Sequence, residues 1–139
     1  MEMRKILIVD DDIDYVETLK VILKEAQYTV TTASNKADGM AKIVTEKPAL
    51  IILDAMMSTW QDGFEMSREL KNHSEFKQIP ILMLTSISET TGVEFKSSAG
   101  NPTWLPVDGF LKKPVGAEIL LSEIERLLHK KSQNDADYR

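Results

Sequence analysis

Five short apolar runs recur along the chain, and three of them are nearly continuous aliphatic stretches. The continuous runs are Ile6 to Val9, Leu50 to Leu53 and Ile79 to Leu84. A strand whose two faces are both covered in a parallel sheet has this pattern, because neither face meets water. We therefore predict three central strands at these positions. Two weaker runs predict further strands at Tyr28 to Ala33 and Gly109 to Leu111.

Segments with helical spacing of apolar residues separate these runs. The spaced positions are Ile13, Val16, Leu19, Ile22, Leu23 and Ala26; Ala37, Met40, Ala41 and Val44; Phe64, Met66 and Leu70 in a segment that starts at about Gly63; and Ile119, Leu120, Ile124, Leu127 and Leu128. Each set is typical of a helix with one buried face. Alternating strands and helices predict right-handed crossovers. We expect an α/β fold with a doubly wound, flavodoxin-like sheet of five parallel strands and helices on both faces.

The ends of these helices carry recognisable signals. Asp12 or Ser34 can cap the helix that follows it, and Gly116 is expected to open the last helix. The segment from Ile87 to Asp108 has two Gly, two Pro and few periodic apolar residues, which predicts a short helix and an extended loop. The polar residues from Lys130 onward are expected to fray into solvent.

The length of 139 residues is that of a single compact domain. We assign residues 1–131 to this domain and residues 132–139 to a polar C-terminal tail. The formal net charge of −5 without a basic stripe disfavours nucleic-acid binding, and the absence of Cys excludes disulfides and thiolate sites. No apolar run is long enough for a signal peptide or a membrane span, so we expect a soluble, cytoplasmic protein.

Chemically suited residues follow four of the predicted strands. Asp10 and Asp11 follow the first, Asp54 the third, Thr85 the fourth and Lys113 the fifth. The carboxyl ends of parallel strands meet at one edge, where ligands of such sheets bind. Clustered carboxylates repel one another unless a cation neutralises them, and oxygen ligands of this kind suit Mg²⁺. We therefore expect a site for Mg²⁺ and a phosphoryl group.

Asp54 is the most informative of these residues. An Asp at a strand end is often only a turn former or a helix cap, and the Lys and Thr taken singly have similarly ordinary explanations. Asp54 instead follows four aliphatic residues and precedes Ala55, Met56 and Met57, so burying it without a partner would be unfavourable. Carboxylates serve as covalent phosphoryl acceptors. Asp54 can thus be the nucleophile, with Lys113 and Thr85 holding the phosphoryl oxygens.

Five sequence landmarks in order resemble those of response-regulator receiver domains from two-component signalling. They are KILIVDDD at 5–12, LIILDAMM at 50–57, DGFEM at 62–66, PILMLTS at 80–86 and DGFLKKP at 108–114. The resemblance covers almost the whole chain and is specific as a set. It implies a receiver without an output domain in this chain, which takes a phosphoryl group from a histidine kinase or phosphotransfer protein.

The same resemblance implies roles for individual residues. Asp54 would be the phosphoacceptor, and Mg²⁺ would be bound by Asp11, Asp54 and the main-chain carbonyl of Met56, with Asp10 acting mostly through water. Lys113 would contact the phosphoryl group. Thr85 and Phe110 would form the switch that changes on activation and passes the signal to a separate effector protein, and Asp12 would be a helix cap.

Three departures from the family pattern concern the surroundings of the site. Ser58 stands where the family usually has Pro, and Asp62-Gly63 comes one residue late, so the loop that carries Trp60 is longer. The stretch from Thr85 to Lys113 is also longer than typical, and it covers the family's usual switching surface. Phe110 lacks the phenolic hydroxyl that many members carry.

Two other functions remain open at this point. A receiver-like interaction module that is not phosphorylated is motivated by the altered loop after Asp54. A phosphatase of the haloacid dehalogenase type is motivated by Asp10 to Ile13, but it needs acidic residues after a later strand, where only Asp108 is available, and it leaves Asp54 unexplained. A homodimer that forms on phosphorylation is a further open question.

Overall fold

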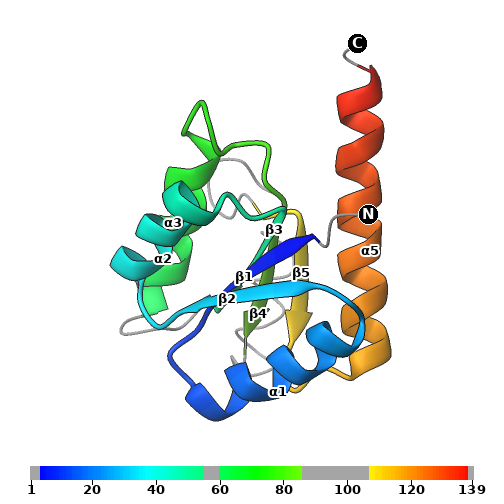
Figure 1. Cartoon of the computed structure of the whole chain (residues 1–139). Coiled ribbons are helices and arrows are strands. Elements are labelled where there is room, and N and C mark those ends of the chain that lie inside the picture. Colours follow the sequence, from blue (N-terminus) through cyan, green and yellow to red (C-terminus); the bar gives the residue numbers. More distant parts are fainter. Residues whose placement is uncertain (1–3, 55–59, 86–106, 138–139) are drawn as a thin grey trace.

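The computed structural model describes residues 4–54, 60–85 and 107–137, of which 60–62 and 130–137 are described by their backbone alone. Its strands are β1 (Lys5–Val9), β2 (Thr29–Ala33), β3 (Leu50–Asp54), β4 (Ile81–Thr85) and β5 (Gly109–Lys112). Its helices are α1 (Ile13–Glu25), α2 (Lys36–Glu46), α3 (Trp60–Lys71) and α5 (Ala117–Asp137) (Figure 1). The five predicted strands are confirmed.

The strands form one parallel sheet in the order β2-β1-β3-β4-β5. The runs predicted to be central, β1, β3 and β4, are indeed the three inner strands. The chain moves outward from β1 to β2 and then, from β3, outward in the opposite direction. The strand order therefore reverses between β1 and β3, which is where a doubly wound sheet binds its ligands.

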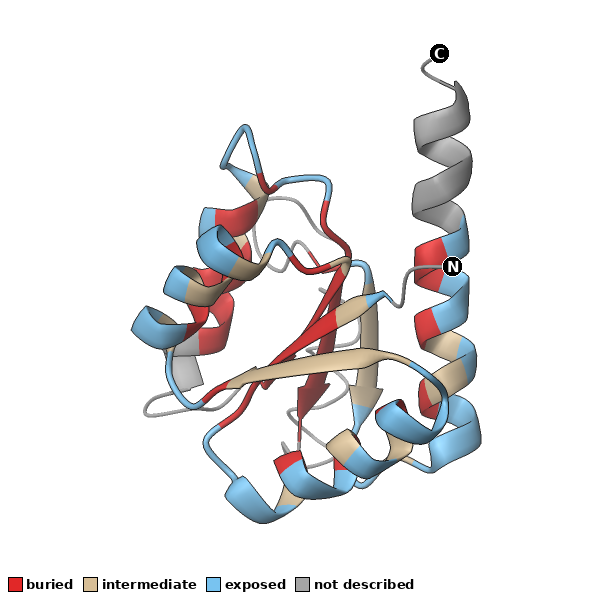
Figure 2. Ribbon diagram, in the orientation of Figure 1, coloured by how far each residue is buried: buried red, intermediate tan, exposed pale blue. Residues whose placement is uncertain are grey.

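Helices cover both faces of the sheet, as predicted: α2 and α3 lie on one face, and α1 and α5 on the other (Figure 1). Side chains of a strand point to alternate faces. Leu7 and Val9 of β1 accordingly pack beneath α2 and α3, whereas Ile6 and Ile8 pack beneath α1 and α5. Figure 2 shows the result, with buried central strands between helices whose outer surfaces are exposed.

Polar side chains cap α1 and α2, and a glycine precedes α5. The Asp12 carboxylate accepts a hydrogen bond from the Tyr15 backbone N–H at 3.1 Å, which confirms it as the cap of α1. The prediction of Ser34 as the cap of α2 is wrong by one residue: the Asn35 side chain accepts from the Asp38 N–H at 2.8 Å. The Gly116 carbonyl accepts from the Leu120 N–H at 3.0 Å, so Gly116 opens α5 as expected.

Two helices are longer than predicted. α3 begins at Trp60 rather than at about Gly63, and α5 continues to Asp137 through residues expected to fray. After Gly116 the sequence contains no Gly or Pro that would end the helix. The domain division at residue 131 stays a prediction, and the predicted short helix and loop fall mostly on residues 86–106, outside the described residues. None of the helices in the described parts has the length and apolar character that crossing a membrane requires.

Candidate functional site

The carboxyl ends of four strands bring the predicted site residues to one edge of the sheet. Asp54 is the last residue of β3 and pairs in register with Leu84, one residue before Thr85 at the end of β4. Asp10 directly follows β1, and Lys113 directly follows β5. Asp10, Asp54 and Thr85 are only 4%, 5% and 1% exposed. Polar groups buried this deeply need partners, and here they lie together.

Three carboxylates form a candidate metal centre. One oxygen from each of Asp10, Asp11 and Asp54 lies within 4.8 Å of the other two; Asp10 and Asp54 are buried and Asp11 is exposed. Three like charges at this separation favour binding of a cation, and carboxylate oxygens suit a hard divalent ion. The acidic pocket can therefore bind a metal. The predicted main-chain ligand, the Met56 carbonyl, lies outside the described residues, as does Ser58.

Both oxygens of Asp10 already have protein partners. Oδ1 accepts a hydrogen bond from the Asp12 backbone N–H at 2.9 Å, and Oδ2 accepts one from the Lys113 Nζ at 2.7 Å. An oxygen engaged in this way is less available for direct contact with an ion. Direct contact between Asp10 and an ion would require one of these two hydrogen bonds to be exchanged, so the role of Asp10 at a metal stays a prediction.

Lys113 places a positive charge between two of the carboxylates. Its Nζ lies 2.7 Å from Asp10 Oδ2 and 3.6 Å from Asp54 Oδ1, and its side chain is 13% exposed. Burial lowers the pKa of Lys113, but the hydrogen bond with Asp10 and the nearby charge of Asp54 raise it by more, so the pKa lies above its ordinary value. The ammonium is therefore charged at neutral pH, and a positive charge at this place is suited to contact with an anionic oxygen.

The backbone around Lys113 is tied to the neighbouring strand. Its N–H donates to the Thr85 carbonyl at 2.7 Å, and the Lys113–Pro114 peptide bond is cis. Thr85 thus ends β4 beside Asp54 and beside the backbone of Lys113. Phe110, the other predicted switch residue, is half-buried and packs against the hydrophobic core beneath α2 and α3.

Sequence reasoning missed Tyr15, which lies in the first turn of α1. The Lys113 Nζ is 4.6 Å from the centroid of the Tyr15 ring, and the Tyr15 hydroxyl accepts a hydrogen bond from the Val115 N–H at 3.4 Å. An aromatic residue next to a helix cap resembles any core residue in the sequence. Only the position of the β5–α5 connection beside α1 distinguishes it.

The arrangement does not support a phosphatase of the haloacid dehalogenase type. Asp108, the acidic residue available for such a site, precedes β5 and lies at the opposite edge of the sheet. Its Oδ2 accepts hydrogen bonds from Lys71 Nζ at 2.7 Å and from the Ile81 N–H at 2.8 Å. Asp108 therefore joins α3 to the beginnings of β4 and β5. Asp54, which that alternative leaves unused, lies within the carboxylate cluster.

Comparisons with known proteins agree with this geometry. The family model described as the response regulator receiver domain matches residues 6–125. Protein PilH of Pseudomonas aeruginosa is 31% identical over 91% of this chain and 98% of its own length, and protein PilG of the same organism is 33% identical over 87% and 84%. The crystal structure of a CheY-like receiver domain protein from Methanospirillum hungatei superposes with a TM-score of 0.78, at 28% identity over 96% of this chain and 99% of that one.

Other relatives are longer than this chain. It spans about half the length of several, among them the transcriptional regulatory protein GltR of Pseudomonas aeruginosa, which is 33% identical over 91% of this chain and 50% of its own length. The residues that match the family model, 6–125, contain nearly all of the five-stranded sheet. The sequence match and the order of the strands lead to the same result: the chain belongs to the response regulator receiver domain family of two-component systems.

Proposed function

We propose that Asp54 accepts a phosphoryl group from the phosphohistidine of a histidine kinase or a phosphotransfer protein. The observation that carries this proposal is the position of the buried Asp54 carboxylate, within 4.8 Å of oxygens of Asp10 and Asp11 and 3.6 Å from the Lys113 ammonium. An Asp54 oxygen attacks phosphorus, the bond from phosphorus to the histidine nitrogen breaks, and an acyl phosphate forms. The released imidazole takes up a proton.

Mg²⁺ is the metal that we propose for the acidic pocket. Asp11, Asp54 and the Met56 carbonyl would hold it, with Asp10 acting through water because both of its oxygens have protein partners. When bound, Mg²⁺ neutralises the clustered carboxylates and the charge on the phosphoryl oxygens. Its preference for keeping several waters suits a pocket with one exposed carboxylate.

Lys113 and Thr85 hold the remaining phosphoryl oxygens in this proposal. The Lys113 ammonium moves from its hydrogen bond with Asp10 to a phosphoryl oxygen on Asp54, a short shift because both carboxylates already lie beside it. The Thr85 hydroxyl turns toward the same group, and Phe110 changes its packing with it. Because the Lys113 ammonium already lies beside Asp54, it can stabilise the transferred charge after only a small movement.

The output is a change of surface rather than a chemical product. Receiver domains are signalling switches, and they interact with histidine kinases and downstream effectors. Here Thr85 and Phe110 would shift the population between two forms and so alter the surface around α5. We propose that a separate cytoplasmic effector reads that surface. The chain would also catalyse slow hydrolysis of its own acyl phosphate.

Intact-protein mass spectrometry tests the proposal directly. The protein is incubated with a small acyl-phosphate donor, with and without Mg²⁺, and compared with Asp54→Asn. A single phosphoryl adduct that requires both Mg²⁺ and Asp54 is expected. Asp12→Asn is the matched control, because it removes a neighbouring carboxylate while Asn can still cap α1; it should form the adduct. Absence of an adduct from the wild-type protein in every condition would favour the unphosphorylated interaction module.

A further inference from the structure

We propose that Tyr15 is a positioning residue that keeps the Lys113 ammonium directed at Asp54 during phosphoryl transfer. This role of Tyr15 rests on the proposed function, because Lys113 acts in that reaction. The carrying observation is the position of the Lys113 Nζ over the Tyr15 ring, 4.6 Å from its centroid, on an ammonium that also contacts both buried carboxylates.

Tyr15 has one hydrogen bond at its backbone and another at its hydroxyl. Its backbone N–H donates to the capping carboxylate of Asp12 at 3.1 Å, which holds the first turn of α1 in place. Its hydroxyl accepts from the Val115 N–H at 3.4 Å, two residues beyond Lys113. Between these points the half-buried ring packs against the core beneath α1 and α5. Tyr15 therefore connects α1 to the segment that carries Lys113.

The ring supplies a contact that an aliphatic side chain cannot give. The face of an aromatic ring carries partial negative charge and attracts an ammonium, most strongly where water is excluded. The Lys113 side chain is only 13% exposed, with Asp10 2.7 Å and Asp54 3.6 Å from its Nζ. A Lys side chain is otherwise flexible, and its ammonium is strongly hydrated. The ring thus contributes to holding the charge beside the two carboxylates.

This placement matters most when the phosphoryl group arrives. Lys113 must then exchange its hydrogen bond with Asp10 for one with a phosphoryl oxygen on Asp54. A fixed ring beside the ammonium limits that movement to a short shift between two neighbouring acceptors. Limiting the geometries that a catalytic group can adopt before the reaction raises the rate of transfer.

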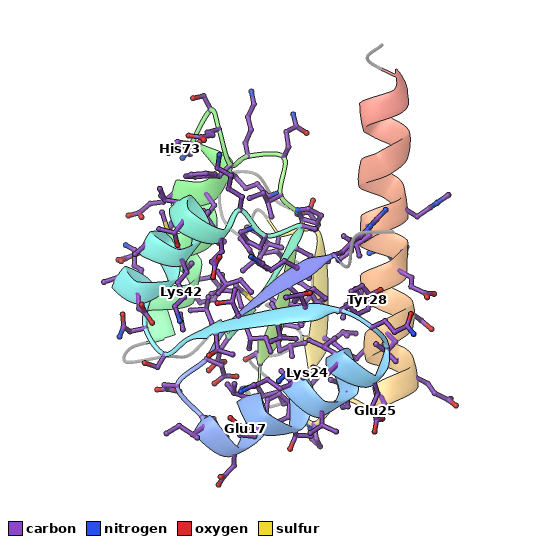
Figure 3. All side chains as sticks on the ribbon, in the orientation of Figure 1. Glu17, Lys24, Glu25, Tyr28, Lys42 and His73 are labelled. Atoms are coloured by element: carbon purple, nitrogen blue, oxygen red, sulfur yellow. The ribbon has the colours of Figure 1, made fainter. Side chains whose placement is uncertain are left out.

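Three substitutions of Tyr15 distinguish a positioning role from a role in core packing alone. Tyr15→Phe keeps the ring face and removes only the hydroxyl, whereas Tyr15→Leu and Tyr15→Met keep an apolar side chain and remove the ring face. Tyr28→Leu is the matched control: Tyr28 is also half-buried against the core beneath α1 and α5, but it precedes β2 at the opposite edge of the sheet (Figure 3). It removes an aromatic ring from the same core without touching Lys113.

The first measurement is the initial rate of adduct formation by mass spectrometry at saturating Mg²⁺ over a range of donor concentrations. Tyr15→Leu should lower the maximal rate by about three- to tenfold, with little change in the half-saturating donor concentration. Tyr15→Met, which also tests the idea if Tyr15→Leu fails to fold, should behave in the same way. Tyr15→Phe should stay within about twofold of the wild-type rate, and Tyr28→Leu should match the wild type.

The second measurement does not depend on phosphorylation. Carbon–proton NMR of the unphosphorylated protein should show ring-current shifts of the Lys113 side-chain methylene signals. These shifts should persist in Tyr15→Phe and disappear in Tyr15→Leu and Tyr15→Met. A wild-type protein that shows the shifts but forms no adduct would contradict the proposed function while leaving the contact intact.

Four results would contradict the proposal that Tyr15 positions Lys113. Wild-type maximal rates in both Tyr15→Leu and Tyr15→Met would do so, as would equal slowing of all three Tyr15 variants. Slowing by Tyr28→Leu of the same size would assign the effect to core packing. Methylene signals of Lys113 that do not respond to Tyr15→Leu and Tyr15→Met would show that the ring does not contact the lysine.

Discussion

At the scale of single residues, Lys113 is the counter-charge on which the resting site depends. Its ammonium lies against two carboxylates that are 4% and 5% exposed, those of Asp10 and Asp54. Removing one partner of a buried ion pair leaves an uncompensated charge. We expect Lys113→Met to lower the free energy of unfolding by about 3 kcal/mol without Mg²⁺, measured by urea denaturation. Mg²⁺ should restore more stability to this variant than to the wild type, because it can replace the lost positive charge.

The control for this prediction is Lys112→Met, which removes an exposed ammonium one position away and should change the stability by less than about 0.5 kcal/mol. The pH dependence gives a further check. The folded pKa of Lys113 is raised above 10.5, so its stabilisation is fully present below 10.5 and is lost as the pH rises through the folded value. The stability difference between wild type and Lys113→Met should therefore stay constant from about pH 7 to pH 9. A difference that disappears within this range would contradict the assignment.

At the scale of secondary-structure elements, Gly39 sets how closely α2 packs on β1. A Cβ at this position would lie 3.0 Å from Met66 Cε and 3.1 Å from Val9 Cγ2. The Met66 end can move, but the branched Val9 side chain of a central strand is held by its rotamer. Ala gains up to about 1 kcal/mol in helix propensity, whereas overpacking costs about 1–3 kcal/mol. We expect Gly39→Ala to lower the free energy of unfolding by about 1 kcal/mol in urea denaturation.

Gly116→Ala is the matched control, because a Cβ there would meet nothing within 4 Å. Its effect should stay within about 0.5 kcal/mol, because the weaker N-cap preference of Ala is opposed by the lower conformational entropy of the unfolded chain. If Gly39→Ala instead stabilises the protein more than Gly116→Ala does, α2 can move away from β1 without loss. Equal small effects at both glycines would likewise remove the packing explanation.

The elements also show which features a sequence can predict. The strands were predictable because β1, β3 and β4 are buried on both faces, which leaves an aliphatic run that is continuous but too short for a typical helix. Helix ends were harder. Ser34 and Asn35 are both good caps, and the choice depends on the backbone turn after β2, which places Asn35 in the extended conformation. α5 continues beyond its predicted end because polar residues alone do not end a helix.

The candidate site divides in the same way. That Asp10, Asp54, Thr85 and Lys113 lie together could be predicted from their places at the ends of strands, since parallel strands end at one edge. The sequence could not predict how these residues pair. Lys113 and Asp10 are 103 positions apart, and no periodicity specifies which carboxylate accepts the hydrogen bond from the ammonium in the resting state. Tyr15 was missed because its effect depends on the distance between α1 and the residues that follow β5.

At the scale of the whole molecule, we expect the site to couple metal binding to global stability. Its residues come from the ends of β1, β3, β4 and β5, so the carboxylate cluster exists only when the sheet is assembled. An ion that binds only the folded state raises the free energy of unfolding by about 2.7 kcal/mol when its free concentration is a hundred times its dissociation constant. We expect Mg²⁺ to stabilise the wild-type protein progressively in urea denaturation, by about 1.4 kcal/mol per tenfold increase once the site is nearly saturated.

The substitutions locate this coupling within the acidic cluster. Asp11→Asn and Asp54→Asn each remove one charge from the candidate metal centre and should weaken the Mg²⁺ dependence, even if they stabilise the metal-free protein by relieving repulsion. Asp12→Asn keeps the cap of α1 and should retain the dependence. An unchanged Mg²⁺ increment in both Asp11→Asn and Asp54→Asn would place the ion elsewhere. Since Asp54 is expected both to bind the ion and to accept the phosphoryl group, a weakened increment together with loss of the adduct in Asp54→Asn would connect the stability of the sheet to the chemistry at its edge.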